Sequence, residues 1–185
     1  VESITVDAVT GDGDQVTMTG STAAHRLYDY AGYTVLADSS RTFRYRAENF
    51  DSVEVDAAAG SRNSAYLYDS PNDDTLTASP DGVLMNRAEG STDTTLSGFQ
   101  RVFAFATDGN DRADMTGSDG VRNRFYGYAQ YNVLTESRRS FYFYARGFDS
   151  VNAESPGSGH AYAYLHDSPG VDSFEANPAF AEMIR

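Results

Sequence analysis

The sequence contains no cysteine, lysine or tryptophan among its 185 residues. Without cysteine, disulfide bonds and cysteine-based zinc sites are excluded. No apolar run approaches the length of about 20 residues that a transmembrane helix needs, and the first residues lack the pattern of a signal peptide. The chain starts at Val1 rather than at a methionine, so we expect it to be a mature or excised segment of a longer protein.

Basic residues are scarce. The chain has 27 acidic residues against 14 arginines, which gives a formal net charge of -13. Such an acidic protein repels nucleic acids and anionic membranes, so we expect neither nucleic-acid binding nor membrane insertion. The same charge attracts divalent cations, which makes bound Ca²⁺ the one cofactor to consider.

Aromatic residues, in contrast, are abundant: the chain has 13 Tyr and 11 Phe within an apolar fraction of 40%, which is enough for a buried core. Short stretches alternate apolar and polar residues as strands do, and no window keeps a helical period. Clusters of Gly, Asn, Asp, Pro and Ser separate these stretches, as turns require. The predicted strands include residues 43–47, 52–57, 65–69, 74–78, 83–85, 94–99 and 141–145.

The sequence repeats itself every 49 residues. Apolar residues hold this period in six columns, one of them with single-residue slips. The columns are Phe50/Phe99/Phe148, Ile4/Val53/Val102/Val151, Val6/Val55/Ala104/Ala153, Leu27/Leu76/Phe125/Phe174, Leu36/Met85/Leu134/Met183 and Met18/Leu67/Met115/Leu165. A period of this length indicates a repeat architecture, in which each unit buries its apolar face against its neighbours.

We therefore divide the chain into one array of units at about 1–50, 51–99, 100–148 and 149–185, the last incomplete. A second period of 98 residues lies above the first: "AYLYDSPNDDTLTASP" at 65–80 returns as "AYLHDSPGVDSFEANP" at 163–178. The duplicated unit is thus predicted to be a pair of 49-residue repeats.

Two all-β architectures fit this pattern. In a β-solenoid the units stack along an axis, whereas in a four-bladed β-propeller each unit forms one blade. We favour the solenoid, because its open array accommodates an incomplete unit and because alanine-rich strands suit tight stacking.

The acidic residues gather in two turns of the repeat, and the two turns alternate. Odd repeats are acidic in the first turn and even repeats in the second. Carboxylate and amide oxygens are the ligands that Ca²⁺ prefers, although Asp and Asn are also ordinary turn residues. The candidate metal ligands are Asp12, Asp14, Asp69, Asp73, Asp74, Asp108, Asn110, Asp111, Asp167 and Asp172.

The stretches "GDGDQVTM", "DGNDRADM" and "DSPNDDTL" resemble degenerate hemolysin-type (RTX-like) calcium-binding repeats. The whole unit is similar to long-period repeats of very large bacterial secreted or surface proteins. This resemblance implies an extracellular or cell-surface location, an adhesin-like or structural role and stabilisation by Ca²⁺.

Tyrosine-rich stretches form a second candidate site. Rows of exposed tyrosines can bind sugars or another protein, although such rows can also be plain surface ladders. The candidate binding residues are Tyr28, Tyr30, Tyr33, Tyr126, Tyr128 and Tyr131.

Catalysis finds little support in the sequence. The histidines His25, His160 and His166 occupy non-equivalent repeat positions, and no nucleophile motif occurs. We predict a non-enzymatic structural or adhesive segment that associates with itself, end to end or laterally, or with a surface polysaccharide. The alternatives are a carbohydrate- or protein-binding propeller module and a β-helical polysaccharide-active enzyme.

Overall fold

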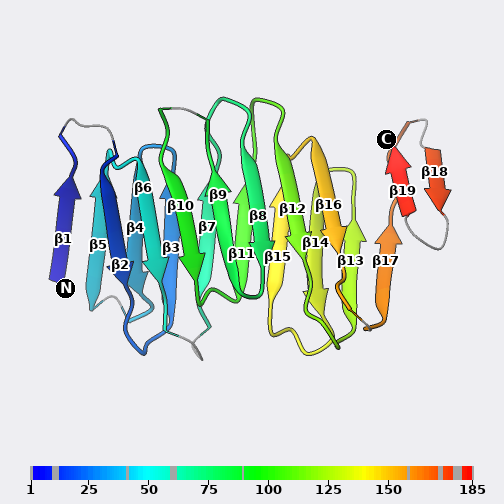
Figure 1. The fold of residues 1–185 in the computed structure, drawn as a ribbon, viewed down its shortest axis with the longest axis horizontal. Helices are drawn as coiled ribbons and strands as arrows, with labels where there is room; N and C mark the ends of the chain where they lie inside the picture. Colours follow the sequence, from blue (N-terminus) through cyan, green and yellow to red (C-terminus); the bar gives the residue numbers. More distant parts are fainter. Residues whose placement is uncertain are drawn as a thin grey trace.

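The structure is a computed structural model that describes residues 2–9, 13–40, 42–58, 62–88, 90–157, 159–170, 173–176 and 181–184. All regular elements in these ranges are β-strands, and most of them form two sheets that lie over one another (Figure 1). Within the same ranges, no helix is long and apolar enough to cross a membrane.

Sheet A has ten strands and sheet B has seven. The order in sheet A is β1 (Glu2–Asp7), β5 (Phe43–Glu48), β4 (Tyr33–Asp38), β3 (His25–Tyr30), β7 (Ser64–Tyr68), β11 (Arg101–Phe105), β15 (Tyr142–Arg146), β14 (Tyr131–Glu136), β13 (Asn123–Gly127) and β17 (Ala161–Leu165). The order in sheet B is β16 (Ser150–Glu154), β12 (Arg112–Thr116), β8 (Thr75–Ser79), β9 (Gly82–Asn86), β10 (Asp93–Ser97), β6 (Ser52–Asp56) and β2 (Gln15–Thr19). A separate hairpin joins β18 (Ser173–Ala176) to β19 (Ala181–Ile184).

Each of the first three repeats supplies two single strands followed by a three-stranded antiparallel meander. The meander is β3–β4–β5 in the first repeat, β8–β9–β10 in the second and β13–β14–β15 in the third. The first strand of each meander pairs in parallel with a strand of the following repeat, as β3 does with β7 and β8 with β12. The last strand pairs in parallel with the first strand of its own repeat, as β5 does with β1 and β10 with β6. This stacking of parallel strands makes the fold a β-solenoid, so the solenoid prediction is confirmed and the propeller alternative is wrong.

The meanders of successive repeats lie on opposite sides of the array. The meander belongs to sheet A in the first repeat, to sheet B in the second and again to sheet A in the third. Figure 1 shows most strands of one sheet pointing up and most strands of the other pointing down. Neighbouring repeats are therefore related by half a turn about the long axis plus a shift along it. Two repeats restore the starting orientation, which explains why 98 residues are the duplicated unit.

The core lies between the two sheets and is built from the predicted columns. Because equivalent residues alternate between sheets, each column enters the core from both sides. Leu27 and Leu36 extend from sheet A, and their equivalents Leu76 and Met85 extend from sheet B, all at most 1% exposed. Strand β7 alternates in burial, with Ala65 and Leu67 buried and Tyr66 and Tyr68 half-buried on the outer side. The columns become exposed only toward the ends of the array. Ile4 and Val6 on β1 are each 45% exposed, as are Tyr162 and Tyr164 on the outer side of β17.

One repeat position requires a left-handed backbone. Asn49, Gly98 and Gly147 are 49 residues apart and have φ angles of 61°, 75° and 86°. Glycine adopts this conformation freely, and asparagine is among the residues that tolerate it best. At Gly98 a side chain is also excluded by space, because a Cβ atom would lie 1.8 Å from the carbonyl oxygen of Ala57. The glycine lets the turn after β10 approach the strand-end of the same repeat.

Candidate functional site

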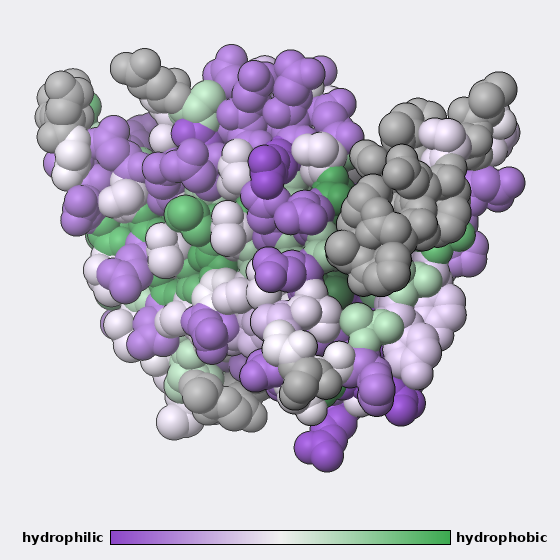
Figure 2. Space-filling view, turned by 45° about the vertical axis from the view of Figure 1, so that its right-hand side comes forward, coloured by the Kyte–Doolittle hydropathy of each residue, from purple (hydrophilic) through white to green (hydrophobic). Residues whose placement is uncertain are grey.

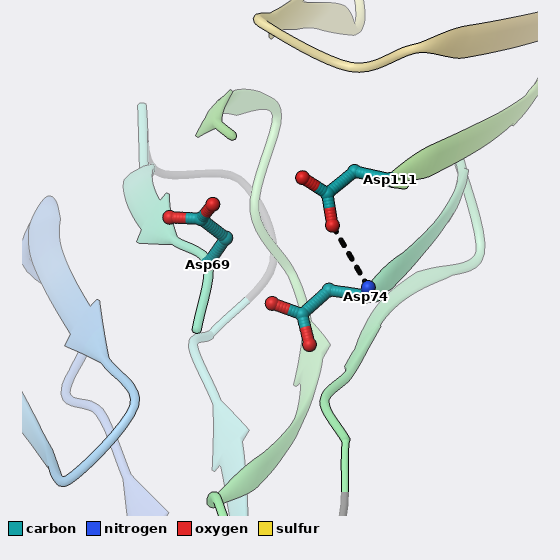
Figure 3. A group of neighbouring side chains, drawn as sticks. All are labelled: Asp69, Asp74 and Asp111. Carbon is teal, nitrogen blue, oxygen red and sulfur yellow. Dashed lines mark hydrogen bonds between the residues drawn. The ribbon is translucent and has the colours of Figure 1, made fainter. Parts of the chain in front are cut away.

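Three of the predicted metal ligands converge at one place. Asp69 follows β7, Asp74 precedes β8 and Asp111 precedes β12 (Figure 3). One carboxylate oxygen from each lies within 4.8 Å of the others, and Asp74 and Asp111 are each only 1% exposed. We call these three residues, with the turns that carry them, the charged junction. Among the described residues it is the one group of carboxylates this close together.

Backbone hydrogen bonds hold each of these carboxylates. Asp74 accepts hydrogen bonds from the backbone of Ser70 at 2.5 Å and of Ala88 at 3.0 Å. Asp111 accepts one from the backbone N–H of Asp74 at 2.8 Å, and Asp69 accepts one from Thr107 at 2.5 Å. Asp74 therefore closes a turn within its own repeat, whereas Asp69 and Asp111 accept hydrogen bonds across the boundary between two repeats.

Among the three carboxylates of the charged junction, Asp111 is the one whose negative charge is disfavoured by burial and by its acidic neighbours. Burial raises the pKa of this carboxyl group from 3.8 to about 6; the backbone N–H of Asp74 opposes the rise, and the negative charges of Asp69, Asp74 and Asp149 add to it. Of the two carboxylate oxygens of Asp111, one receives the Asp74 N–H. A proton or a cation at this position would relieve the repulsion.

The charged junction explains why the acidic turns alternate in the sequence. Since repeats alternate sides, the second turn of an even repeat lies against the first turn of the following odd repeat, where β8 pairs with β12. Asp73 illustrates the contact, because it accepts a hydrogen bond at 2.9 Å from the backbone of Asn110 across this boundary. The two acidic turns in the sequence are thus two halves of one structural junction.

The remaining predicted ligands do not join a described carboxylate cluster. Asp14 lies at the start of β2, where its N–H donates to Asp51 at 2.8 Å. Asp108 and Asp167 are exposed. Asp12 and Asp172 lie outside the described residues.

The opposite sheet contains a neutral copy of the same junction, which the sequence reasoning missed. There the side chain of Asn63 accepts the backbone N–H of His25 at 2.8 Å, as Asp111 does for Asp74. The Gln100 side chain accepts the N–H of Asn63 at 3.0 Å, as Asp149 does for Asp111.

His25 also closes its own turn, because it accepts the N–H of Ser21 at 2.9 Å, as Asp74 accepts that of Ser70. His25 is 49 residues from Asp74, and Gln100 is 49 from Asp149. This 49-residue spacing was the feature of the sequence that could have shown the two junctions to be equivalent. Because an imidazole and two amides build the same backbone network, the turns do not require negative charge.

A second buried polar group joins the two sheets. Arg87, at the end of β9, donates to Asp29 of β3 at 2.6 Å, and both side chains are 0% exposed. Asp29 also accepts hydrogen bonds from Thr34 at 2.5 Å and Thr94 at 2.9 Å. Arg87 donates further to the backbone carbonyls of Tyr68 and Thr92. Burial raises the pKa of Asp29, and the positive charge of Arg87 opposes that rise.

The predicted tyrosines lie on the outer side of sheet A, all half-buried. Their rings stack along the array: Tyr30 lies 4.5 Å from Tyr68 with an interplanar angle of 1°, and Tyr28 lies 5.1 Å from Tyr66 at 11°. Tyr126 stacks on Tyr164 in the same way. Since these rings cover one another's faces, they present edges and hydroxyl groups outward. This arrangement disfavours sugar binding by ring-face stacking and favours hydrogen bonding along the row.

No family model, curated protein or solved structure matches this chain.

Proposed function

We propose that this chain is a non-enzymatic structural segment, a stiff and extendable spacer within a large extracellular or cell-surface protein. The observation that supports this most directly is the half-turn relation between repeats. Because the charged junction reuses the hydrogen-bond pattern of the neutral junction in the preceding repeat, on the opposite sheet, the array can lengthen by adding repeat pairs without a new type of contact. Such one-dimensional growth is the property that repeat proteins use to span distance.

The distribution of the histidines agrees with a structural role. His25 is 1% exposed and closes a turn, whereas His160 and His166 flank β17, at the far end of sheet A from β3. His25 and the two histidines beside β17 thus have separate surroundings, and the buried His25 is fully used in hydrogen bonds to Ser21 and Asn63. A polysaccharide-active enzyme, the alternative from the sequence, gains no support from this arrangement.

Small-angle scattering tests the proposal. We expect the 185-residue chain to be elongated and a chain carrying a second copy of residues 1–98 at its N-terminus to be longer by about five strand spacings of roughly 4.8 Å. The cross-section should stay the same in both. A duplicated chain whose cross-section grows while its length stays constant would contradict a spacer.

Calcium binding remains a prediction from the sequence, and the charged junction is where it can be tested. If Ca²⁺ bridges Asp69, Asp74 and Asp111, millimolar Ca²⁺ should raise the melting temperature and EDTA should reverse the rise, because a ligand of the folded state stabilises it by mass action. Mg²⁺ at the same concentration serves as the control for ionic strength. Identical melting curves in Ca²⁺, Mg²⁺ and EDTA would contradict calcium binding.

A further inference from the structure

The two outer surfaces of the solenoid carry opposite charge. Side chains alternate along each strand, so the residues between the core positions point outward. On sheet A the outward residues include six arginines and only two carboxylates, Asp7 and Glu48. The arginines are Arg26, Arg44, Arg46, Arg101, Arg124 and Arg146. Nearly half of the 14 arginines of an acidic chain are therefore collected on one sheet face.

The outer face of sheet A is also rich in hydrogen-bond donors. Between the arginines lie the stacked tyrosine rows, whose rings turn their hydroxyl-bearing edges outward. Arg46 lies over the ring of Tyr33, with its guanidinium carbon 3.9 Å from the ring centroid. Guanidinium groups and phenol hydroxyls together form a surface suited to a partner that offers carboxylate and hydroxyl oxygens.

The outer face of sheet B has such a composition. Its outward residues include five carboxylates, Glu54, Asp56, Asp93, Asp114 and Glu154, and a single arginine, Arg112. Threonines and serines fill most of the remaining outward positions of β2, β8 and β10. The side of the molecule drawn in Figure 2 shows a mainly hydrophilic surface with smaller apolar patches.

The two faces also share one spacing. Both sheets advance by one strand, about 4.8 Å, at each step along the array, and both add five strands per 98-residue repeat pair. When two copies lie side by side with their long axes parallel, rows on one face therefore stay in step with rows on the other. A favourable contact made once recurs along the full length of the array.

We propose that the arginine- and tyrosine-rich outer face of sheet A binds the acidic outer face of sheet B of a second copy, so that solenoids associate laterally. The contact joins two different surfaces and leaves one of each free, so it continues as an open stack rather than closing as a dimer. A polyanion as partner would explain the positive charge of sheet A but not the negative charge of sheet B. A second copy of the chain as partner explains the charge of both faces. At roughly 0.15 M salt, repulsion between the net charges is screened beyond about 8 Å, while charge pairs in contact still attract.

The test uses two charge-reversed variants. The first carries Arg26→Glu, Arg44→Glu and Arg146→Glu on sheet A, and the second carries Glu54→Arg, Asp56→Arg and Glu154→Arg on sheet B; all six residues are exposed. In sedimentation velocity at roughly 0.15 M salt, the wild type should form oligomers that grow with concentration. Each variant alone should associate at least tenfold more weakly, and an equimolar mixture of the two should associate again, because each then meets a face of opposite charge.

A matched control separates the face from the overall charge. Arg62→Glu, Arg138→Glu and Arg139→Glu lie in exposed loops at the strand ends and change the net charge as much as the first variant does. This control should associate like the wild type. Circular dichroism melting checks that all variants fold, and raising the salt to about 1 M should weaken wild-type association whether or not the variants fold.

A monomeric wild type, an unchanged first variant or a mixture that stays monomeric would each overturn the proposal. So would a soluble polyuronate that binds sheet A without any self-association. The inference rests on the structural role proposed above, but its failure would leave that role intact, because scattering from a single elongated particle tests the spacer separately.

Discussion

Replacing Arg87 by methionine should lower the free energy of unfolding by about 3–5 kcal/mol, the cost usually found when one member of a buried ion pair is removed. Arg87 is fully buried, and its guanidinium is the counter-charge of Asp29. In the variant, Asp29 would remain between the sheets without this partner. The carbonyl of Tyr68 would lose two donors and that of Thr92 one. Urea unfolding at pH 7 measures the loss.

Two further variants give this prediction its control. Replacing both members, Asp29→Leu with Arg87→Met, should recover part of the loss, because an apolar pair leaves no uncompensated charge. Arg112→Met makes the same substitution in an exposed ion pair, where Arg112 lies 2.8 Å from Asp114 with 58% of its side chain exposed, and should change stability by less than about 1 kcal/mol. Equal losses of unfolding free energy in the Arg87→Met and Arg112→Met variants would show that the buried ion pair contributes no more to stability than the exposed one.

Replacing Asp111 by asparagine should stabilise the protein at neutral pH by about 0.5–2 kcal/mol, in the range usual for relief of an unfavourable charge. The asparagine keeps the oxygen that accepts the Asp74 N–H. Asn63 performs this task at the equivalent place in the neutral junction, so the backbone geometry already accommodates an amide.

The stability advantage of the Asp111→Asn variant over the wild type should grow as the pH rises. The pKa of Asp111 is raised from 3.8 to about 6, so between these values the folded protein retains a proton that the unfolded chain has released. The contribution of Asp111 to stability therefore declines as the pH rises from about 4 to about 6, and stays low above that. Melting curves in EDTA should show the asparagine variant gaining over the wild type across this interval.

The reverse substitution and calcium provide the checks. Asn63→Asp should destabilise the protein, because the Asn63 amide donates to the carbonyls of Ala58 and Gly98, which a carboxylate would repel. Any stabilisation of the wild type by Ca²⁺ should be weaker in the Asp111 variant. A pH-independent difference between wild type and Asp111→Asn would argue against the raised pKa.

Much of the fold follows from the sequence. Alternation located strands such as β6 (Ser52–Asp56) and β8 (Thr75–Ser79), and the 49-residue period identified the core columns. The half-turn between repeats could not be derived from the period, because equal spacing shows that two residues are equivalent but not on which side of the array each lies. The alternation of the acidic turns was the one feature of the sequence that reflected the half-turn.

The candidate sites were predicted less completely. Composition drew attention to the acidic turns, but it could not show that Asp111 and Asp74 face each other across a repeat boundary. The pair of Asp29 and Arg87 was missed because it breaks the repeat: Gly127 stands 98 residues after Asp29. The sequence did contain one indication of the pair: in the alternation of β3, Asp29 falls on the same buried side as Leu27.

The half-turn between repeats also restricts how such a chain can change length. Inserting or deleting one 49-residue unit would rotate everything that follows by half a turn, so downstream arginine-rich faces would continue as acidic faces. The hydrogen-bonded junction at the splice would also pair turns of the wrong kind. Only even numbers of units leave both surfaces continuous, so recombination in this gene can be neutral in steps of 98 residues but not in steps of 49.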